Sequence, residues 1–255
     1  MAQDEQAYGA AAGACATVER PASAEAEQAE GDALSTMPAV LEGRAAFYEM
    51  LASLFYGPLS EEQIDAMARQ DFSAYRGLNE DFDSGINDMA RYLRKRNTGT
   101  RQELACDFTS SIGGTKSYAG KFAVPYESVF TSEEGLLCRD AFHEVLGAYR
   151  RACLRKKDGL NIPEDHISFQ FQFLAILSRR AAAHLGNADV AGSVDDLAKS
   201  RSFLDEHVLN WFDDFRDRAL LIVGTRFYRG VFALARGYLM FDRGLLDDCI
   251  EVLGS

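Results

Sequence analysis

Apolar side chains return every three or four positions from residue 39 to residue 56, which is the spacing of one helix face. Leu41, Phe47, Leu51 and Leu54 fall near that face, and Gly57-Pro58 follows it as a stop signal. The pattern predicts a helix with one buried face, followed by a turn.

The same spacing continues in shorter segments up to residue 157. Ser60 with Gln63 and Thr131 with Glu134 have the spacing of a capping box, in which a side chain at each end of the motif bonds the other residue's backbone. Residues 113–130 show no regular period and read as a loop. We expect helices over 60–69, 82–93, 100–112 and 131–157.

The segment after Asp158-Gly159 predicts a long central helix. Pro163 suits the first helical position, and Glu164 and Asp165 place negative charge at the positive end of the helix dipole. Phe169, Phe171 and Phe173 alternate with polar residues, as in a strand, but no Gly or Pro occurs from residue 164 to residue 185. We therefore expect a helix that is buried nearly all round.

The remaining third of the chain keeps the helical period. The pattern predicts helices that start at Ser193, cover 209–223 and 225–241, and end with a short segment over 245–253. About nine to ten helices and no confident strand indicate an all-α fold in a single helical domain over 39–255. The turn at 155–162 is a candidate hinge between an N-terminal and a C-terminal half, so a monomer or a domain-swapped dimer is expected.

Charge separates the first 38 residues from this body. They hold seven acidic residues, one basic residue and twelve alanines, a net charge of −6 in a chain whose net charge is −12. Such a segment buries too little apolar area to offset the entropy of ordering it, so we expect a disordered acidic tail over 1–38.

Composition excludes several classes of protein. No uncharged apolar run is long enough to span a membrane, no basic leader with an apolar core precedes the body, and net acidity disfavours a nucleic-acid partner. The five cysteines are odd in number, widely spaced and free of Cys-x-x-Cys, which indicates a reducing compartment; we expect most of them to be small buried residues. A cytoplasmic location is predicted.

Motifs of enzyme chemistry are missing. Residues 113–117 (GGTKS) resemble the end of a phosphate loop, but the loop needs glycine directly before the lysine and another five residues earlier. No nucleophile elbow is present, and none of the four histidines pairs at helical metal-ligand spacing. We expect no catalytic residue, no metal and no cofactor.

Two places remain as candidate binding sites. Asp165-His166 stands at a predicted helix start, where both groups could offer hydrogen bonds into a groove; the alternative is local, with Asp165 capping its own helix. The loop 113–130 carries several aromatic residues, among them Phe122 and Tyr126. Its aromatics could pin the loop to the body or line a peptide-binding groove.

Five motifs in order resemble the TorD/DmsD/NarJ family of molybdoenzyme maturation chaperones, most closely its TorD/DmsD branch, over about residues 40–250. They are Tyr48-x-x-Leu51-x-x-Leu54-Phe55-x-x-Pro58, Asp107-Phe108-Thr109, Pro125-Tyr126-Glu127-Ser128-Val129-Phe130, Pro163-Glu164-Asp165-His166-Ile167 and Phe203-Leu204-x-x-His207-x-x-x-Trp211.

The resemblance implies an all-α cytoplasmic chaperone without catalytic residues. Such a chaperone binds the twin-arginine leader of a molybdopterin-containing oxidoreductase, or its apoprotein, and delays export until the cofactor is loaded. The family pattern commonly has Glu where Gln170 stands; Gln170 keeps the hydrogen bonding of that position and loses its charge. The resemblance implies leader binding by Asp165 and His166 and by the loop Pro125, Tyr126, Glu127 and Ser128. We add the neighbouring residues Glu164, Gln170 and Phe122 as candidates for the same site. A helical interaction module that binds a folded partner without reading a leader is the alternative.

Overall fold

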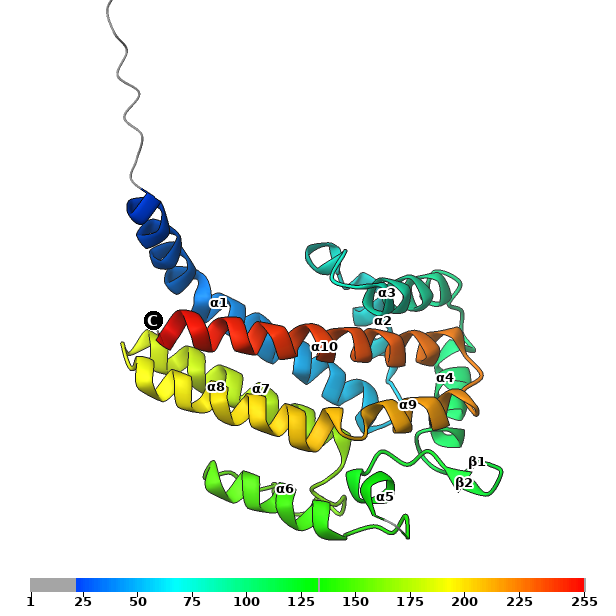
Figure 1. Ribbon diagram of the computed structural model, residues 1–255. Helices are drawn as coiled ribbons and strands as arrows, with labels where there is room; N and C mark the ends of the chain where they lie inside the picture. Colours follow the sequence, from blue (N-terminus) through cyan, green and yellow to red (C-terminus); the bar gives the residue numbers. More distant parts are fainter. Residues whose placement is uncertain (1–21, 133, 255) are drawn as a thin grey trace, which may run out of the picture.

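The computed structural model describes residues 22–132 and 134–254 and is built almost entirely of helices (Figure 1). Its helices and strands are α1 (Ala22–Tyr56), α2 (Glu61–Arg69), a 3₁₀ turn η1 (Ser73–Tyr75), α3 (Glu80–Leu93), α4 (Thr100–Ser110), β1 (Ser117–Tyr118), β2 (Lys121–Phe122), α5 (Glu127–Thr131), α6 (Asp140–Arg151), α7 (Ile167–Gly186), α8 (Val190–Leu204), a π turn η2 (Asp205–Leu209), α9 (Phe212–Leu220) and α10 (Arg226–Gly254). The all-α prediction is confirmed.

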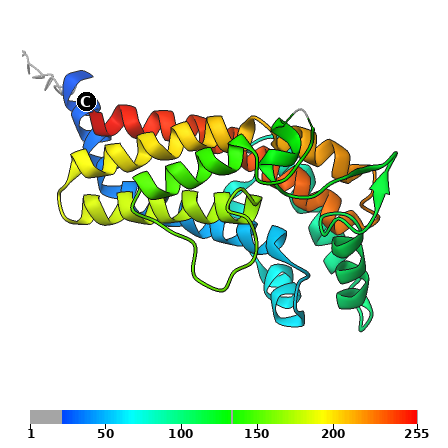
Figure 2. The ribbon, with the colours of Figure 1, turned by 90° about the horizontal axis from the view of Figure 1, so that it is seen from below.

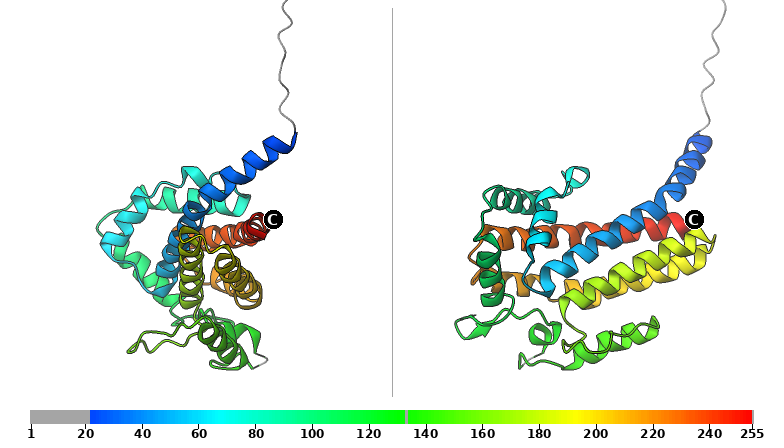
Figure 3. Two further views of the ribbon diagram at one scale, coloured as in Figure 1. Left: turned by 90° about the vertical axis from the view of Figure 1, so that its left-hand side faces the viewer. Right: turned by 180° about the vertical axis from the view of Figure 1, so that it is seen from behind.

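Four long helices form the core. α7 lies between α1 and α8, while α10 packs on α1, α3 and α8 (Figures 1 and 3). Because α1 precedes residue 160 and α7, α8 and α10 follow it, the core is shared by both parts of the chain. No described helix is both long and apolar enough to cross a membrane.

The alternating phenylalanines of α7 face different neighbours. Phe171 packs on Tyr48 and Phe55 of α1, whereas Phe173 packs on Tyr149 of α6 and Phe203 of α8. Both side chains are buried because α7 is covered on several sides. The strand-like period is therefore a consequence of a helix at the centre of the core, as the sequence predicted.

A buried charge cluster ties three of these helices together. The Arg44 guanidinium on α1 donates to both carboxylate oxygens of Asp242 on α10, at 2.7 and 2.9 Å. Tyr48 Oη donates to the same carboxylate at 2.6 Å, and Arg44 Nη1 reaches the Leu174 carbonyl of α7 at 3.4 Å. Sequence analysis did not find this cluster, because its members lie almost 200 residues apart.

Glycines let α3 approach α10 closely. A Cβ atom on Gly85 would stand 2.4 Å from the Leu234 nitrogen, and one on Gly237 would stand 2.5 Å from the Phe82 nitrogen. Both distances are shorter than any real Cβ contact, so the two helix backbones touch only because these positions lack side chains.

Asp107 on α4 fixes the start of α10. Its carboxylate accepts the Gly224 and Thr225 backbone N–H groups at 2.9 and 2.8 Å and the Thr225 hydroxyl at 2.5 Å. Asp107 therefore holds the segment before α10 and orients the Thr225 hydroxyl, which accepts the Tyr228 backbone N–H at 3.3 Å and caps the helix.

Two predicted boundaries are wrong in the N-terminal half. α1 begins at Ala22 and not near residue 39, because alanine and glutamate have high intrinsic helix propensity and extend the helix into the Ala-rich segment. Residues 1–21 lie outside the described residues. The helix expected over 131–157 is also wrong: α5 ends at Thr131 and α6 covers only 140–151, because Gly135 and Cys138 adopt positive φ between them.

Three further corrections concern ends and loops. α10 runs unbroken through Gly244, so the predicted break between 241 and 245 is wrong. The loop 113–130 contains a two-stranded hairpin, β1 with β2, and the short helix α5. Of the four cysteines that the structure describes, only Cys249 is buried, so the expectation of mostly buried cysteines is wrong. The loop 152–166 separates α6 from α7, and its hinge role stays a prediction.

Candidate functional site

The loop before α5 and the segment before α7 lie side by side. Tyr126 and His166 form an isolated antiparallel bridge, in which Ile167 N donates to the Pro125 carbonyl at 2.9 Å and Glu127 N donates to the Asp165 carbonyl at 3.1 Å. The two motifs that sequence analysis singled out therefore meet, although almost 40 residues separate them.

Asp165 caps a helix, but not its own. Its Oδ2 accepts the backbone N–H of Ser128 at 3.0 Å and the Ser128 hydroxyl at 2.6 Å, at the first turn of α5. The carboxylate is fully buried, and Oδ1 has no hydrogen-bond partner among the described residues. The expectation that Asp165 caps the helix after it is wrong because α7 begins at Ile167, two residues later than Asp165.

His166 caps α7 in its place. Its Nδ1 accepts the Ser168 backbone N–H at 3.1 Å, and the edge of its ring meets the Tyr126 ring at a centroid distance of 5.0 Å. Burial lowers the pKa of the His166 imidazole to about 4. At neutral pH the ring is uncharged, which is the state that can accept a backbone hydrogen bond at Nδ1.

Glu127 is the centre of a buried polar cluster. Gln170 Nε2 donates to Glu127 Oε2 at 2.6 Å, and Asn210 Nδ2 donates to Oε1 at 3.2 Å. His207 Nδ1 also lies 3.2 Å from Oε1, on the π turn η2. Burial raises the pKa of the Glu127 carboxyl, and the contacts with His207 and Asn210 oppose that rise. A Glu at position 170 would face this carboxylate, whereas Gln170 donates a hydrogen bond to it.

The remaining predicted residues reach the surface to different degrees. Phe122 on β2 is 45% exposed, and Tyr126 is half-buried. Glu164 pairs with Lys156 at 3.2 Å and its side chain is about 17% exposed. Pro125, Glu127, Ser128, Asp165, His166 and Gln170 are buried.

We call the set Glu127, Ser128, Asp165, His166, Gln170, His207 and Asn210 the joint; its members are buried except for Asn210, an exposed residue whose amide reaches Glu127. Asn210 was missed by sequence analysis, and no local signal marks it. The joint connects α5, the start of α7 and the π turn, and its carboxylates are engaged internally. It can position surface groups, but in this conformation it does not present open charge to a ligand.

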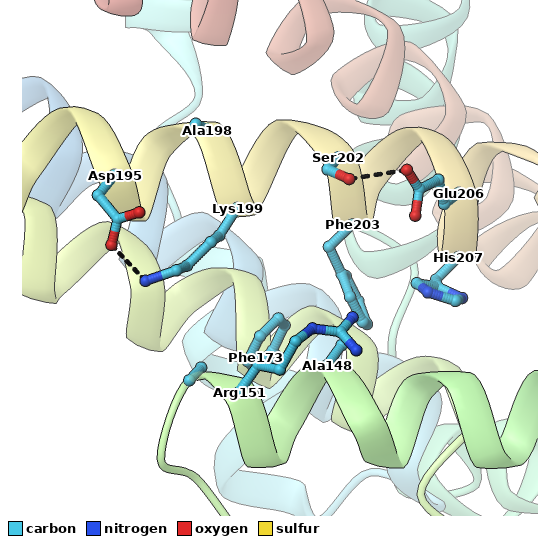
Figure 4. Close-up of a pocket in the computed structure, with 11 residues that line it drawn as sticks. Ala148, Arg151, Phe173, Asp195, Ala198, Lys199, Ser202, Phe203, Glu206 and His207 are labelled. Atoms are coloured by element: carbon cyan, nitrogen blue, oxygen red, sulfur yellow. Dashed lines mark hydrogen bonds and ion pairs between the residues drawn. The ribbon is translucent and has the colours of Figure 1, made fainter.

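A hollow of about 330 Å³ lies next to the joint, between α6 and α8 (Figure 4). Phe173 and Phe203 form an apolar floor, and His207 links the hollow to Glu127 of the joint. The rim is charged: Lys199 pairs with Asp195, and the Ser202 hydroxyl donates to Glu206 at 2.8 Å (Figure 4).

Metal chemistry has no ready site in this arrangement. Within 22–132 and 134–254, no group of three or more His, Cys, Asp or Glu side chains is placed to hold a metal ion. The joint contains two carboxylates and two imidazoles, and their contacts are with each other, with amides and with a hydroxyl.

The fold defines a class of protein: a single all-helical domain without a metal site among the described residues. The family model described as nitrate reductase delta subunit matches residues 76–217, more than half of the chain. The chain belongs to this family, and the family resemblance read from the motifs is confirmed.

Three curated relatives from different species carry the same name. Chaperone protein TorD of Vibrio cholerae serotype O1 is 30% identical over 220 residues, covering 82% of this chain and 94% of that protein. Chaperone protein TorD of Vibrio vulnificus is 25% identical over 210 residues, covering 80% and 95%. Chaperone protein TorD of Aliivibrio fischeri is 22% identical over 215 residues, covering 82% and 97%.

Proposed function

We propose that the chain is a cytoplasmic maturation chaperone for a molybdopterin-containing oxidoreductase. It binds the twin-arginine leader of that enzyme, its apoprotein, or both, and delays export until the cofactor is inserted. The observation that carries the proposal is the alignment with the Vibrio cholerae chaperone, which extends over 94% of that protein's length. Because the relatives are named chaperones, we assign no reaction to the chain.

The burial of the joint changes the roles proposed for its residues. Asp165, His166, Glu127, Ser128, Gln170 and Pro125 act as positioning residues. The leader contacts fall to the neighbouring residues that reach the surface, namely Phe122, Tyr126 and Glu164. Glu164 suits the arginine pair, since a guanidinium can make two parallel hydrogen bonds to a carboxylate that Lys156 holds with one ammonium.

Binding of the full chain to synthetic twin-arginine leaders tests the proposal. We expect saturable binding by fluorescence anisotropy, and weaker binding when both leader arginines are replaced by alanine and the apolar stretch is kept. Absence of binding to every leader, from a sample shown to be folded, would overturn leader recognition and favour a module that binds the folded enzyme surface.

A matched pair of variants locates the contact. Glu164→Gln should weaken leader binding by about threefold to tenfold, since it removes one partly buried charge partner. Glu144→Gln, on the exposed face of α6, is the control and should bind like the unchanged chain. Equal affinity of both variants for the leader would remove Glu164 from the site.

A further inference from the structure

Two further hollows run along the outer flank of α7. One, of about 220 Å³, lies between α7 and the loop after α6; the other, of about 430 Å³, lies between α7 and the end of α1. They adjoin, because Leu160, Phe169 and Gln172 line both. Figure 2 shows the loop 152–166 swinging out from the helices before it turns back into α7. We call the two hollows the α7 groove.

The floor of the α7 groove is apolar, with one buried hydroxyl, that of Ser168, unpaired beside it. Phe169 and Leu160 lie at its centre, with Tyr56 at one end and Ile176 at the other. Ser168 also lines the groove, and its buried hydroxyl has no hydrogen-bond partner among the described residues. A buried unpaired hydroxyl beside an apolar floor suits an extended peptide, which brings both apolar side chains and backbone donors and acceptors.

One rim of the groove is basic. Arg155, Lys156 and Lys157 line the smaller hollow. From residue 150 to residue 164 the chain has five basic and two acidic residues, while the whole chain carries a net charge of −12. The rim is therefore positively charged on a protein whose net charge is negative.

The charges on this rim are available to a ligand. Arg155 contacts Asp158 at 3.3 Å, but both side chains are more than 80% exposed, so the pair is worth little. Lys157 is exposed and forms no hydrogen bond or ion pair with any residue that the structure describes. Lys156 differs, because Glu164 and the Ile162 carbonyl hold it against the body.

We propose that the α7 groove binds an extended segment that carries apolar side chains beside carboxylates, in the mature part of the client enzyme. The inference rests on the proposed function and adds a second contact of opposite charge preference. A twin-arginine segment is repelled by the rim, whereas an acidic one is attracted. Leader and mature chain then occupy different surfaces on the two sides of Glu164, whose partner Lys156 belongs to the groove.

The test uses two labelled synthetic peptides and the full chain. In one peptide leucine and glutamate alternate; in the other, lysine replaces every glutamate. We expect the glutamate peptide to bind and the lysine peptide to bind at least about tenfold more weakly, since opposite charges meet at the rim in one case and like charges in the other.

Variants decide whether the groove is responsible. The double variant Arg155→Glu with Lys157→Glu changes only exposed side chains and should reverse the preference between the two peptides. Arg94→Glu with Lys95→Glu, in the exposed basic run after α3, is the matched control and should keep it. Ser168→Ala removes only the unpaired hydroxyl and should weaken the glutamate peptide several-fold.

Results that contradict the groove assignment can be told apart from results that contradict the proposed chaperone function. If neither peptide binds, or the preference survives the groove charge reversal, the groove assignment is wrong; leader binding measured on the same samples reports separately on the chaperone. Sedimentation at the assay concentration tests whether a second copy of the chain occupies the groove. A dimer of the unchanged chain that dissociates in the Arg155→Glu, Lys157→Glu variant would assign the groove to a second copy instead.

Discussion

His166 remains uncharged in the folded chain because burial lowers the pKa of its imidazole to about 4. In the unfolded chain a histidine has a pKa near 6.5. Between these values the unfolded state binds a proton that the folded state excludes. The contribution of His166 to the free energy of unfolding is therefore complete above pH 6.5 and is lost as the pH falls toward 4.

This linkage predicts an acid-labile fold with an identifiable source. The loss reaches about 3 kcal/mol at its fullest, from the difference between the two pKa values. His166→Asn keeps a group that can cap α7 but does not titrate, so the difference between its urea midpoint and that of the unchanged chain should shrink from pH 7 to pH 4.5. His143→Asn, at an exposed position, is the control; an equal change in both variants would contradict the assignment.

Asp165 and Ser128 predict a second effect at the residue scale. Asp165→Asn should lower the free energy of unfolding by about 1–3 kcal/mol, because a buried charged acceptor for two hydrogen bonds is replaced by a neutral group. Ser128→Ala should lower it as well, and the double variant should cost less than the sum. Additive losses in denaturant titration would show that the two groups are not coupled.

Among the elements, local signals were predictable and distant ones were not. The capping box of Ser60 with Gln63 formed as expected, since both partners lie within one turn. The box of Thr131 with Glu134 failed although its spacing is identical, because the chain turns at Gly135 and Thr131 ends α5. The helical periodicity predicted that α7 is buried, but it did not predict that α1, α6 and α8 pack against it.

The candidate site divides in the same way. The motifs at Asp165 and at Pro125–Ser128 could each be read from the sequence, but the hydrogen bond between Asp165 and Ser128 could not. Burial of Glu127 could not be read, because its partners His207, on η2, and Asn210, directly after η2, come from a distant part of the chain. The sequence predicted that acidic side chains line the rim of a groove, but Glu127 and Asp165 are buried in the structure.

The close approach of α3 and α10 makes a paired prediction about glycines. Gly85→Ala should destabilise the fold by about 3 kcal/mol or more, because the new Cβ would meet the Leu234 backbone at 2.4 Å and one helix must move. Gly244 is an exposed position of α10 with no atom within 4 Å of an added Cβ, so Gly244→Ala should stabilise the fold by about 0.5–1 kcal/mol. Thermal unfolding of both variants measures the contrast, and shifts of the same sign would contradict it.

At the scale of the whole molecule, the cluster of Arg44, Tyr48 and Asp242 connects the first long helix to the last. Both charged side chains are almost fully buried, so each depends on the other for a partner. Removal of one member leaves an unpaired charge in the core, which is the costly way to break such a pair.

Asp242→Asn should therefore lower the free energy of unfolding by about 3–5 kcal/mol. Replacing the whole cluster, with Arg44→Met, Tyr48→Phe and Asp242→Leu together, should cost far less, because no polar group is left unpaired. Asp65→Asn breaks the exposed pair with Arg96 and should change stability by less than about 1 kcal/mol. Chemical denaturation of the three variants gives the order; a triple variant less stable than Asp242→Asn would contradict this account.

The same cluster sets the order of events during synthesis. Arg44 leaves the ribosome early, but the carboxylate that neutralises it is 198 residues further along the chain. Until α10 has emerged, the nascent chain carries an unpaired cation on the face of α1 that later becomes core, and α3 lacks the helix on which it packs. The protein therefore completes its core only after α10 has emerged, so we expect a chain stalled before residue 242 to be a substrate for proteases and for other chaperones.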